Sequence, residues 1–155
     1  MDELVREYLA HLRIERGSSP LTVSAYASDL RDFATFLNAC GVKGVGDVQR
    51  ETIVAYEADL FGREYAAATV DRHVSVLKGF YRFLVREGHV RRNPTDTLQL
   101  PKAPDRLPDV LSAVQVESML ADPPKRAPIP LRNRAILEVL YGCGLRVSEC
   151  VGLDL

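Results

Sequence analysis

Arg146 is the residue in this sequence best placed to bind a phosphate. It lies in the segment YGCGLRVSECVGLDL at residues 141–155. Gly142 and Gly144 precede it, and glycine tolerates the backbone conformations that end a helix. A new apolar-periodic segment follows at once, so the pattern predicts that Arg146 occupies a tight turn. Glu149, three residues later, is close enough to hold the guanidinium in place.

A guanidinium fixed at a turn is suited to gripping a phosphate. The same arginine–glutamate pair is also common where it only fixes the start of a helix. No Ser/His/Asp set, glycine-rich phosphate loop or pair of acids accompanies Arg146 in the sequence. Position alone therefore leaves both interpretations open.

Positive charge is concentrated in one short part of the chain. Residues 72–92 carry a net charge of +5, whereas residues 1–71 carry −5. Within the basic part, residues at spacings of 3 and 4 share one helix face, with Lys78 beside them: Arg72, Ser75, Gly79, Arg82 and Arg86. Because an α-helix fits the major groove of duplex DNA, this stripe predicts a DNA-binding helix. The alternative is a solvated basic face that balances an acidic one.

Two features favour DNA over a plain solvated face. The stripe is almost free of acidic residues, and Ser75 and Gly79 are small enough for a helix backbone to approach a groove closely. Thr22, on the polar face of the second predicted helix, could add an uncharged phosphate contact.

Four amphipathic helices are expected to position the stripe, at about residues 2–16, 20–40, 50–61 and 69–87. Ser19 is a suitable N-cap before Pro20, and Gly88 a suitable C-terminal cap. The polar face of the second helix includes Asp29. The sequence predicts an all-α fold in which residues 1–90 form a compact helical bundle.

A proline-rich stretch at residues 91–110 is predicted to be an extended interdomain linker. Residues 111–155 then hold three helices: one that Ser112 and Gln115 cap, one at about 131–141, and the closing segment. The second of these is expected to bury Ile136, Leu137 and Leu140. The three apolar faces have too little to pack against, which predicts the first part of a second domain.

Composition excludes several classes of protein. No apolar run approaches the ~20 residues that span a bilayer, and the first residues are too charged for a signal peptide, so a cytoplasmic protein without a membrane partner is expected. Cys40, Cys143 and Cys150 are expected to be buried free thiols. The three histidines share no metal-like spacing, and no metal site is predicted.

The sequence as a whole resembles the tyrosine site-specific recombinases (the phage integrase family), and among them the bacterial Xer recombinases. The stretch LRNRAILEVLYGCGLRVSECVGLDL is similar to the region around their first catalytic arginine. TVSAYASDLRDFATFL and TVDRHVSVLKGFYRFLVREGHVRRNP resemble the second and fourth helices of their four-helix, SAM-like core-binding domain. RLPDVLSAVQVESML resembles the entry to their catalytic domain.

The resemblance implies a function and a set of site residues. In that family two domains clamp duplex DNA, and a tyrosine attacks the phosphodiester to give a 3′-phosphotyrosyl link, without metal, nucleotide or other cofactor. By matching position, Arg146 corresponds to the first catalytic arginine and Glu149 to a residue that supports it. The DNA-facing positions of the family's fourth helix correspond to Arg72, Ser75 and Lys78, and the stripe extends to Arg82 and Arg86. The DNA-facing position on the second helix corresponds to Thr22.

The resemblance also implies what these 155 residues lack. The other catalytic residues of the family, including the nucleophilic tyrosine, are expected beyond Leu155. The six tyrosines present are expected on core faces: Tyr8, Tyr26, Tyr56, Tyr65, Tyr81 and Tyr141. We therefore expect a truncated recombinase that binds duplex DNA, takes no small-molecule substrate and does not cleave. The parent would resolve chromosome or plasmid dimers as a tetramer with itself or a sister recombinase. A natural noncatalytic protein that occupies recombination sites and a helical protein-interaction module are the alternatives.

Overall fold

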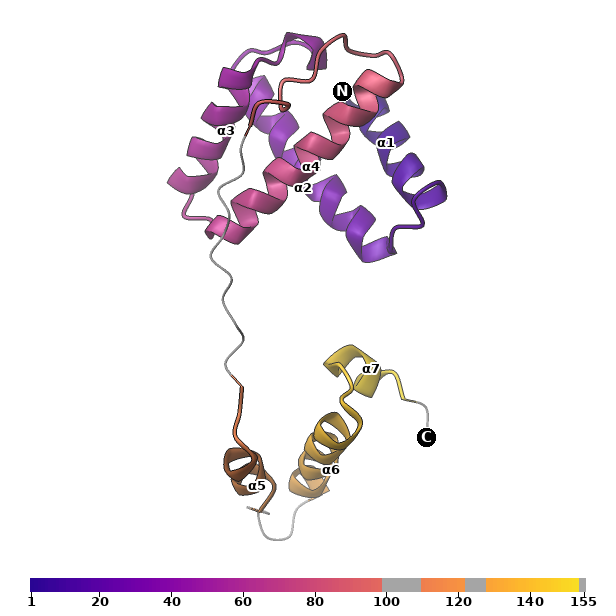
Figure 1. The fold of residues 1–155 in the computed structure, drawn as a ribbon, viewed down its shortest axis with the longest axis vertical. Coiled ribbons are helices and arrows are strands. Elements are labelled where there is room, and N and C mark those ends of the chain that lie inside the picture. The colour runs from indigo at the N-terminus through magenta and orange to yellow at the C-terminus, as the bar shows by residue number, and fades with distance from the viewer. Residues whose placement is uncertain (99–109, 122–127, 154–155) are drawn as a thin grey trace. The chain divides into compact units, whose positions relative to one another are not determined.

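A computed structural model describes residues 1–98, 110–121 and 128–153, and within these ranges all regular structure is helical (Figure 1). The predicted all-α class is confirmed. The chain divides into two compact units, Met1–Pro104 and Asp105–Leu155. The helices of the first unit are α1 (Asp2–Ile14), α2 (Pro20–Ala39), the short 3₁₀ helix η1 (Val45–Asp47), α3 (Arg50–Gly62) and α4 (Ala67–Arg86); those of the second are α5 (Ala113–Ala121), α6 (Pro128–Cys143) and α7 (Val147–Val151).

Helix α4 is the centre of the first unit, because it packs against α1, α2 and α3 (Figure 1). Its inward residues interlock with aromatic rings from the other helices; the Phe80 ring of α4, for example, lies with its centroid 5.4 Å from that of the Tyr8 ring of α1. The core of the unit includes these buried residues: Leu30, Phe33, Leu37, Ile53, Tyr56, Leu60, Val70, Val74, Leu77, Phe80, Tyr81, Phe83 and Leu84. Burial of this apolar surface is the main force that holds the four helices together.

The predicted ends of α2 and α4 follow from local chemistry. The hydroxyl of Ser19 accepts a hydrogen bond from the backbone N–H of Thr22 at 3.1 Å, which caps α2. Gly88 follows α4 with a φ of +78°, a conformation that glycine adopts without strain. Helix α4 begins at Ala67, two residues earlier than expected, because alanine is a strong helix former.

The first part of the predicted linker packs against the first unit. Val90, Thr95 and Leu98 are buried, and the Nζ of Lys78 donates to the carbonyl oxygen of Leu98 at 2.6 Å. Residues up to 98 therefore extend the bundle beyond its predicted end at residue 90. Residues 99–109 lie outside the described part of the chain.

The second unit buries none of the side chains that the structure describes there. Ile136 is 40% exposed and Leu137 and Leu140 are half-buried, so their predicted burial is wrong for Ile136 and partial for the others. Helix α6 is longer than predicted: it starts at Pro128 and includes Gly142, and Gly144, with a φ of +62°, is the glycine that ends it. Within the second unit, α6 contacts both α5 and α7.

Two further sequence-based expectations are wrong. Cys40 and Cys143 are exposed and Cys150 is half-buried, because each lies at or near a helix end rather than on an inward face. Tyr65 and Tyr141 are exposed too, whereas Tyr8, Tyr56 and Tyr81 are buried as expected and Tyr26 is half-buried.

Candidate nucleic-acid interface

The basic stripe lies on the face of α4 that points away from the core. Arg72, Ser75, Arg82 and Arg86 are exposed, and Lys78 and Gly79 are half-buried beside them. The 3.6-residue helical repeat produces this separation, since the buried positions of α4 occupy the opposite face. The stripe predicted from spacing is therefore a continuous surface feature.

Tertiary packing adds residues from α2 and from the turn between α1 and α2 to the stripe. A shallow hollow of about 460 Å³ lies where α1, α2 and α4 meet, and its lining includes Arg16, Ser18, Tyr26, Ser75, Lys78 and Arg82. Sequence reasoning missed Arg16, Ser18 and Tyr26, although the position of Arg16 directly before the turn at Gly17 was a usable signal. The hollow combines three cations with hydroxyl groups, a composition that suits phosphate.

Gly79 is small for a structural reason. A Cβ atom at this position would lie 2.4 Å from the hydroxyl oxygen of Tyr8 on α1, far inside van der Waals contact. Tyr8 is buried, with its ring 5.4 Å from the rings of both Phe80 and Phe83. The absence of a side chain at residue 79 therefore permits close packing of α1 on α4.

Arg72 is tied to a buried carboxylate. Its Nη1 donates to Oδ2 of Asp29 at 2.5 Å. Asp29, expected on the solvent face of α2, has a side chain only 4% exposed, and that expectation is wrong. Close packing of α2 on α4 covers this carboxylate, and burial is tolerable because the charge of Arg72 compensates that of the carboxylate.

The same carboxylate begins a polar network that reaches α3. His73 Nε2 lies 3.3 Å from Asp29, and His73 Nδ1 lies 2.9 Å from the hydroxyl of Tyr56. That hydroxyl also donates to Asp32 at 3.1 Å, and Arg63 binds both oxygens of Asp32 at 3.0 Å. Burial, followed by the charge of Asp32, raises the pKa of Tyr56, so this phenol stays protonated.

The network makes stability sensitive to pH through His73. Burial lowers the pKa of His73, against the opposing effect of the Asp29 carboxylate. Below about pH 6.5, the His73 imidazole takes up a proton more readily in the unfolded chain than in the folded protein. The free energy of unfolding should therefore fall as the pH falls. Urea unfolding followed across this range should show a shallower decline for His73→Gln than for the wild type. An identical decline in both proteins would contradict the assignment.

Two other predicted contact residues already have partners within the protein. Lys78 donates to the carbonyl of Leu98, as described above, and the Thr22 hydroxyl lies 2.9 Å from that of Ser19. A phosphate would therefore share these groups with the fold.

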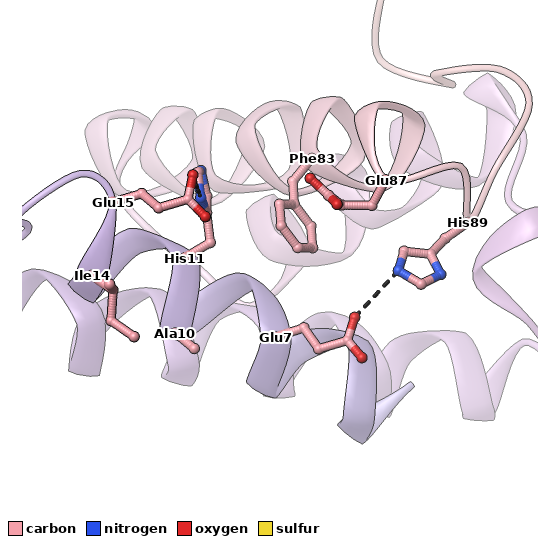
Figure 2. A pocket seen from close by; sticks show the side chains of 8 residues that line it. All are labelled: Glu7, Ala10, His11, Ile14, Glu15, Phe83, Glu87 and His89. Atoms are coloured by element: carbon pink, nitrogen blue, oxygen red, sulfur yellow. Dashed lines mark ion pairs between the residues drawn. The ribbon is translucent and has the colours of Figure 1, made fainter.

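Arg86 lies at the edge of an acidic hollow. Its Nε donates to Glu87 at 2.8 Å, and its Nη2 lies 3.9 Å from Glu15. Figure 2 shows the hollow, between α1 and the end of α4, with the Glu7–His89 ion pair of 3.2 Å drawn across it. Carboxylates repel phosphate, so this end of the stripe is less suited to DNA than the end at Arg72 and Arg82.

Arg146 and Glu149 form the pair that the sequence predicted. Arg146 Nη1 donates to Glu149 Oε1 at 3.2 Å, and the backbone N–H of Arg146 donates to Oε2 at 2.7 Å. The glutamate thus holds both the backbone and the guanidinium of the residue that precedes α7. The arginine side chain is 83% exposed and accessible to a ligand.

Comparison with known proteins shows the family of this chain. Residues 5–88 match the family described as phage integrase, N-terminal SAM-like domain, and residues 109–155 match the phage integrase family. The chain belongs to the phage integrase family. The predicted membership of the tyrosine recombinases, with a Xer-like sequence, is confirmed.

Curated relatives match this phage integrase chain along almost its whole length. Tyrosine recombinase XerC of Roseiflexus castenholzii is 40% identical, over 99% of this chain and 49% of the relative. Tyrosine recombinase XerD of Pseudomonas aeruginosa is 40% identical, over 98% of this chain and 51% of the relative. The chain spans about half the length of these relatives.

A solved structure shares the fold of this phage integrase chain. The integrase from mycobacterium phage Brujita superposes with a TM-score of 0.60 at 27% sequence identity. The match covers 95% of this chain and 47% of the Brujita integrase chain.

The buried tyrosines of the first unit of this phage integrase chain are unsuited to nucleophilic attack. Burial raises the pKa of Tyr8 to about 12 and raises that of Tyr81 as well. A phenol must lose its proton to attack a phosphodiester, and burial opposes that loss. No tyrosine follows Arg146 within the 155 residues.

Two other features are absent from residues 1–98, 110–121 and 128–153. No helix there is long and apolar enough to cross a membrane. The same residues hold no group of three or more His, Cys, Asp or Glu side chains that could bind a metal ion.

Proposed function

We propose that these 155 residues form the DNA-binding part of a Xer-like tyrosine recombinase and bind duplex DNA without cleaving it. Helix α4 lies in the major groove, and the exposed basic stripe of α4 is the observation that carries the proposal. At a rise of about 1.5 Å per residue, the backbones of Arg72 and Arg82 lie about 15 Å apart along the helix axis. The major groove is about 12 Å wide, so these two arginines can reach phosphates on its opposite rims.

The remaining residues have distinct roles in this proposal. Ser75 lies between the two arginines and faces the groove, while Arg16, Lys78 and Thr22 contact the sugar–phosphate backbone. Arg86 contributes less, because Glu87 and Glu15 neutralise it. Arg146, oriented by Glu149, is the first catalytic arginine of the parent enzyme, where a fixed guanidinium would stabilise the charge that develops on the phosphate.

The parent recombinase acts in the cytoplasm on recombination sites, as a tetramer with itself or a sister recombinase, and resolves chromosome or plasmid dimers. It requires no metal, nucleotide or small-molecule substrate. Family membership and the Xer-like sequence support this assignment.

The first test measures binding and cleavage by the wild-type chain. Fluorescence anisotropy with a labelled mixed-sequence duplex should show binding that weakens steeply with salt, because several cation–phosphate contacts release counterions. A nicked duplex that traps covalent intermediates should give no protein–DNA adduct. Absence of duplex binding at low salt would favour a protein-interaction module, and a covalent adduct would refute the claim that the chain does not cleave.

A further inference from the structure

We propose that Asp29 is a positioning residue for the contact between Arg72 and duplex DNA. The inference rests on the proposed function, because it assigns Arg72 a phosphate partner. In this proposal the buried Asp29 carboxylate sets the direction in which the Arg72 guanidinium leaves the protein surface.

Arg72 is held on one edge and open on the other. Its Nη1 donates to Oδ2 of Asp29 at 2.5 Å, while the side chain as a whole is 44% exposed. Among the described residues, no hydrogen-bond acceptor engages Nε or Nη2 of Arg72. A planar guanidinium that uses one nitrogen for the protein can therefore present its other nitrogens to a phosphate.

Asp29 is itself held in place. Its second oxygen, Oδ1, lies 3.3 Å from Nε2 of His73, and His73 Nδ1 lies 2.9 Å from the Tyr56 hydroxyl. A buried carboxylate cannot turn away from its partners without a large desolvation penalty. The anchor of Arg72 is consequently much more rigid than an exposed ion pair would be.

A rigid anchor affects binding in two opposing ways. It removes side-chain freedom before DNA arrives, which improves affinity by about two- to tenfold for one long side chain. Its negative charge also opposes the phosphates, which weakens affinity. In this proposal positioning outweighs charge, because the buried carboxylate cannot turn away from the guanidinium that it holds. The sign of the change on removal of the Asp29 charge therefore distinguishes the two effects.

The experiment compares four variants of the full 155-residue chain by anisotropy with a labelled mixed-sequence duplex at several salt concentrations. Asp29→Asn preserves shape and removes the charge. Asp32→Asn is the matched control, since this neighbouring carboxylate belongs to the same network but bonds Arg63 and Tyr56. Arg72→Ala and the Asp29→Asn/Arg72→Ala double variant complete a cycle, and thermal unfolding confirms that each protein is folded during the measurement.

Asp29→Asn should weaken binding about two- to tenfold. The slope of log affinity against log salt should change by at most about 0.9, toward the slope of Arg72→Ala. The double variant should bind as Arg72→Ala does, because Asp29 acts only through Arg72. Asp32→Asn should keep the wild-type slope. Tighter binding by Asp29→Asn, or a further loss in the double variant beyond Arg72→Ala, would overturn the inference.

Arg72→Lys supplies an independent arm that leaves Asp29 paired with a cation. A single ammonium cannot hold Asp29 and present a second fixed donor, so this variant should bind almost as weakly as Arg72→Ala. Wild-type affinity in Arg72→Lys would overturn the inference and leave the proposed function standing. A wild-type chain that does not bind duplex DNA at all would overturn both.

Discussion

A chain in which Arg72 and Arg82 are both replaced by alanine should bind duplex DNA about a hundredfold to ten-thousandfold more weakly than the wild type. Each charge-assisted contact contributes about 1.5–3 kcal/mol, and about 1.4 kcal/mol corresponds to a factor of ten in affinity. The slope of log affinity against log salt should become less negative by about 1.8, since two phosphate contacts are lost. Anisotropy titrations at several salt concentrations measure both quantities.

The control for this prediction removes positive charge elsewhere on the same unit. Arg6 is exposed near the start of α1, where its Nε donates to the Asp2 carbonyl oxygen, and it does not line the hollow beside α4. Arg6→Ala should change affinity and salt slope little. Equal losses in Arg6→Ala and in either single stripe variant would mean that binding depends on net charge rather than on α4.

Gly79→Ala should destabilise the wild-type protein but stabilise a Tyr8→Phe background. In the wild type, the new methyl group would meet the Tyr8 hydroxyl at 2.4 Å, and the surrounding rings prevent Tyr8 from moving away freely. Overpacking of this kind costs about 1–3 kcal/mol. Without the hydroxyl, the ring atom of residue 8 nearest to the new methyl group is Cζ, at 3.6 Å, which is an ordinary van der Waals contact. The helix propensity of alanine, about 1 kcal/mol better than glycine, then dominates.

Urea unfolding of the four proteins in this cycle gives the coupling energy between residues 8 and 79. It should amount to about 1–3 kcal/mol. If Gly79→Ala has the same effect in both backgrounds, the contact between Tyr8 and residue 79 is not what requires glycine there.

Much of the fold could be predicted from the sequence because its signals are local. The apolar spacing of α4 identifies its inward face without knowledge of any partner, and Ser19 and Gly88 mark helix ends through their own backbone chemistry. The pair of Arg146 and Glu149 was predictable for the same reason, since three residues separate them on one turn. Burial in the second unit was overestimated, because an apolar face becomes buried only when another element covers it.

The composition of the candidate site required the tertiary structure. Spacing on one helix identified Arg72, Ser75 and Arg82, but Arg16 joins them only because the end of α1 packs beside α4. Asp29 looked solvent-exposed in the pattern of α2. Its burial results from the packing of α2 on α4, which brings Asp29 to Arg72, 43 residues away in the sequence. Periodicity assigns a residue to a face of its own helix, whereas the contacts of that face depend on how separate helices pack.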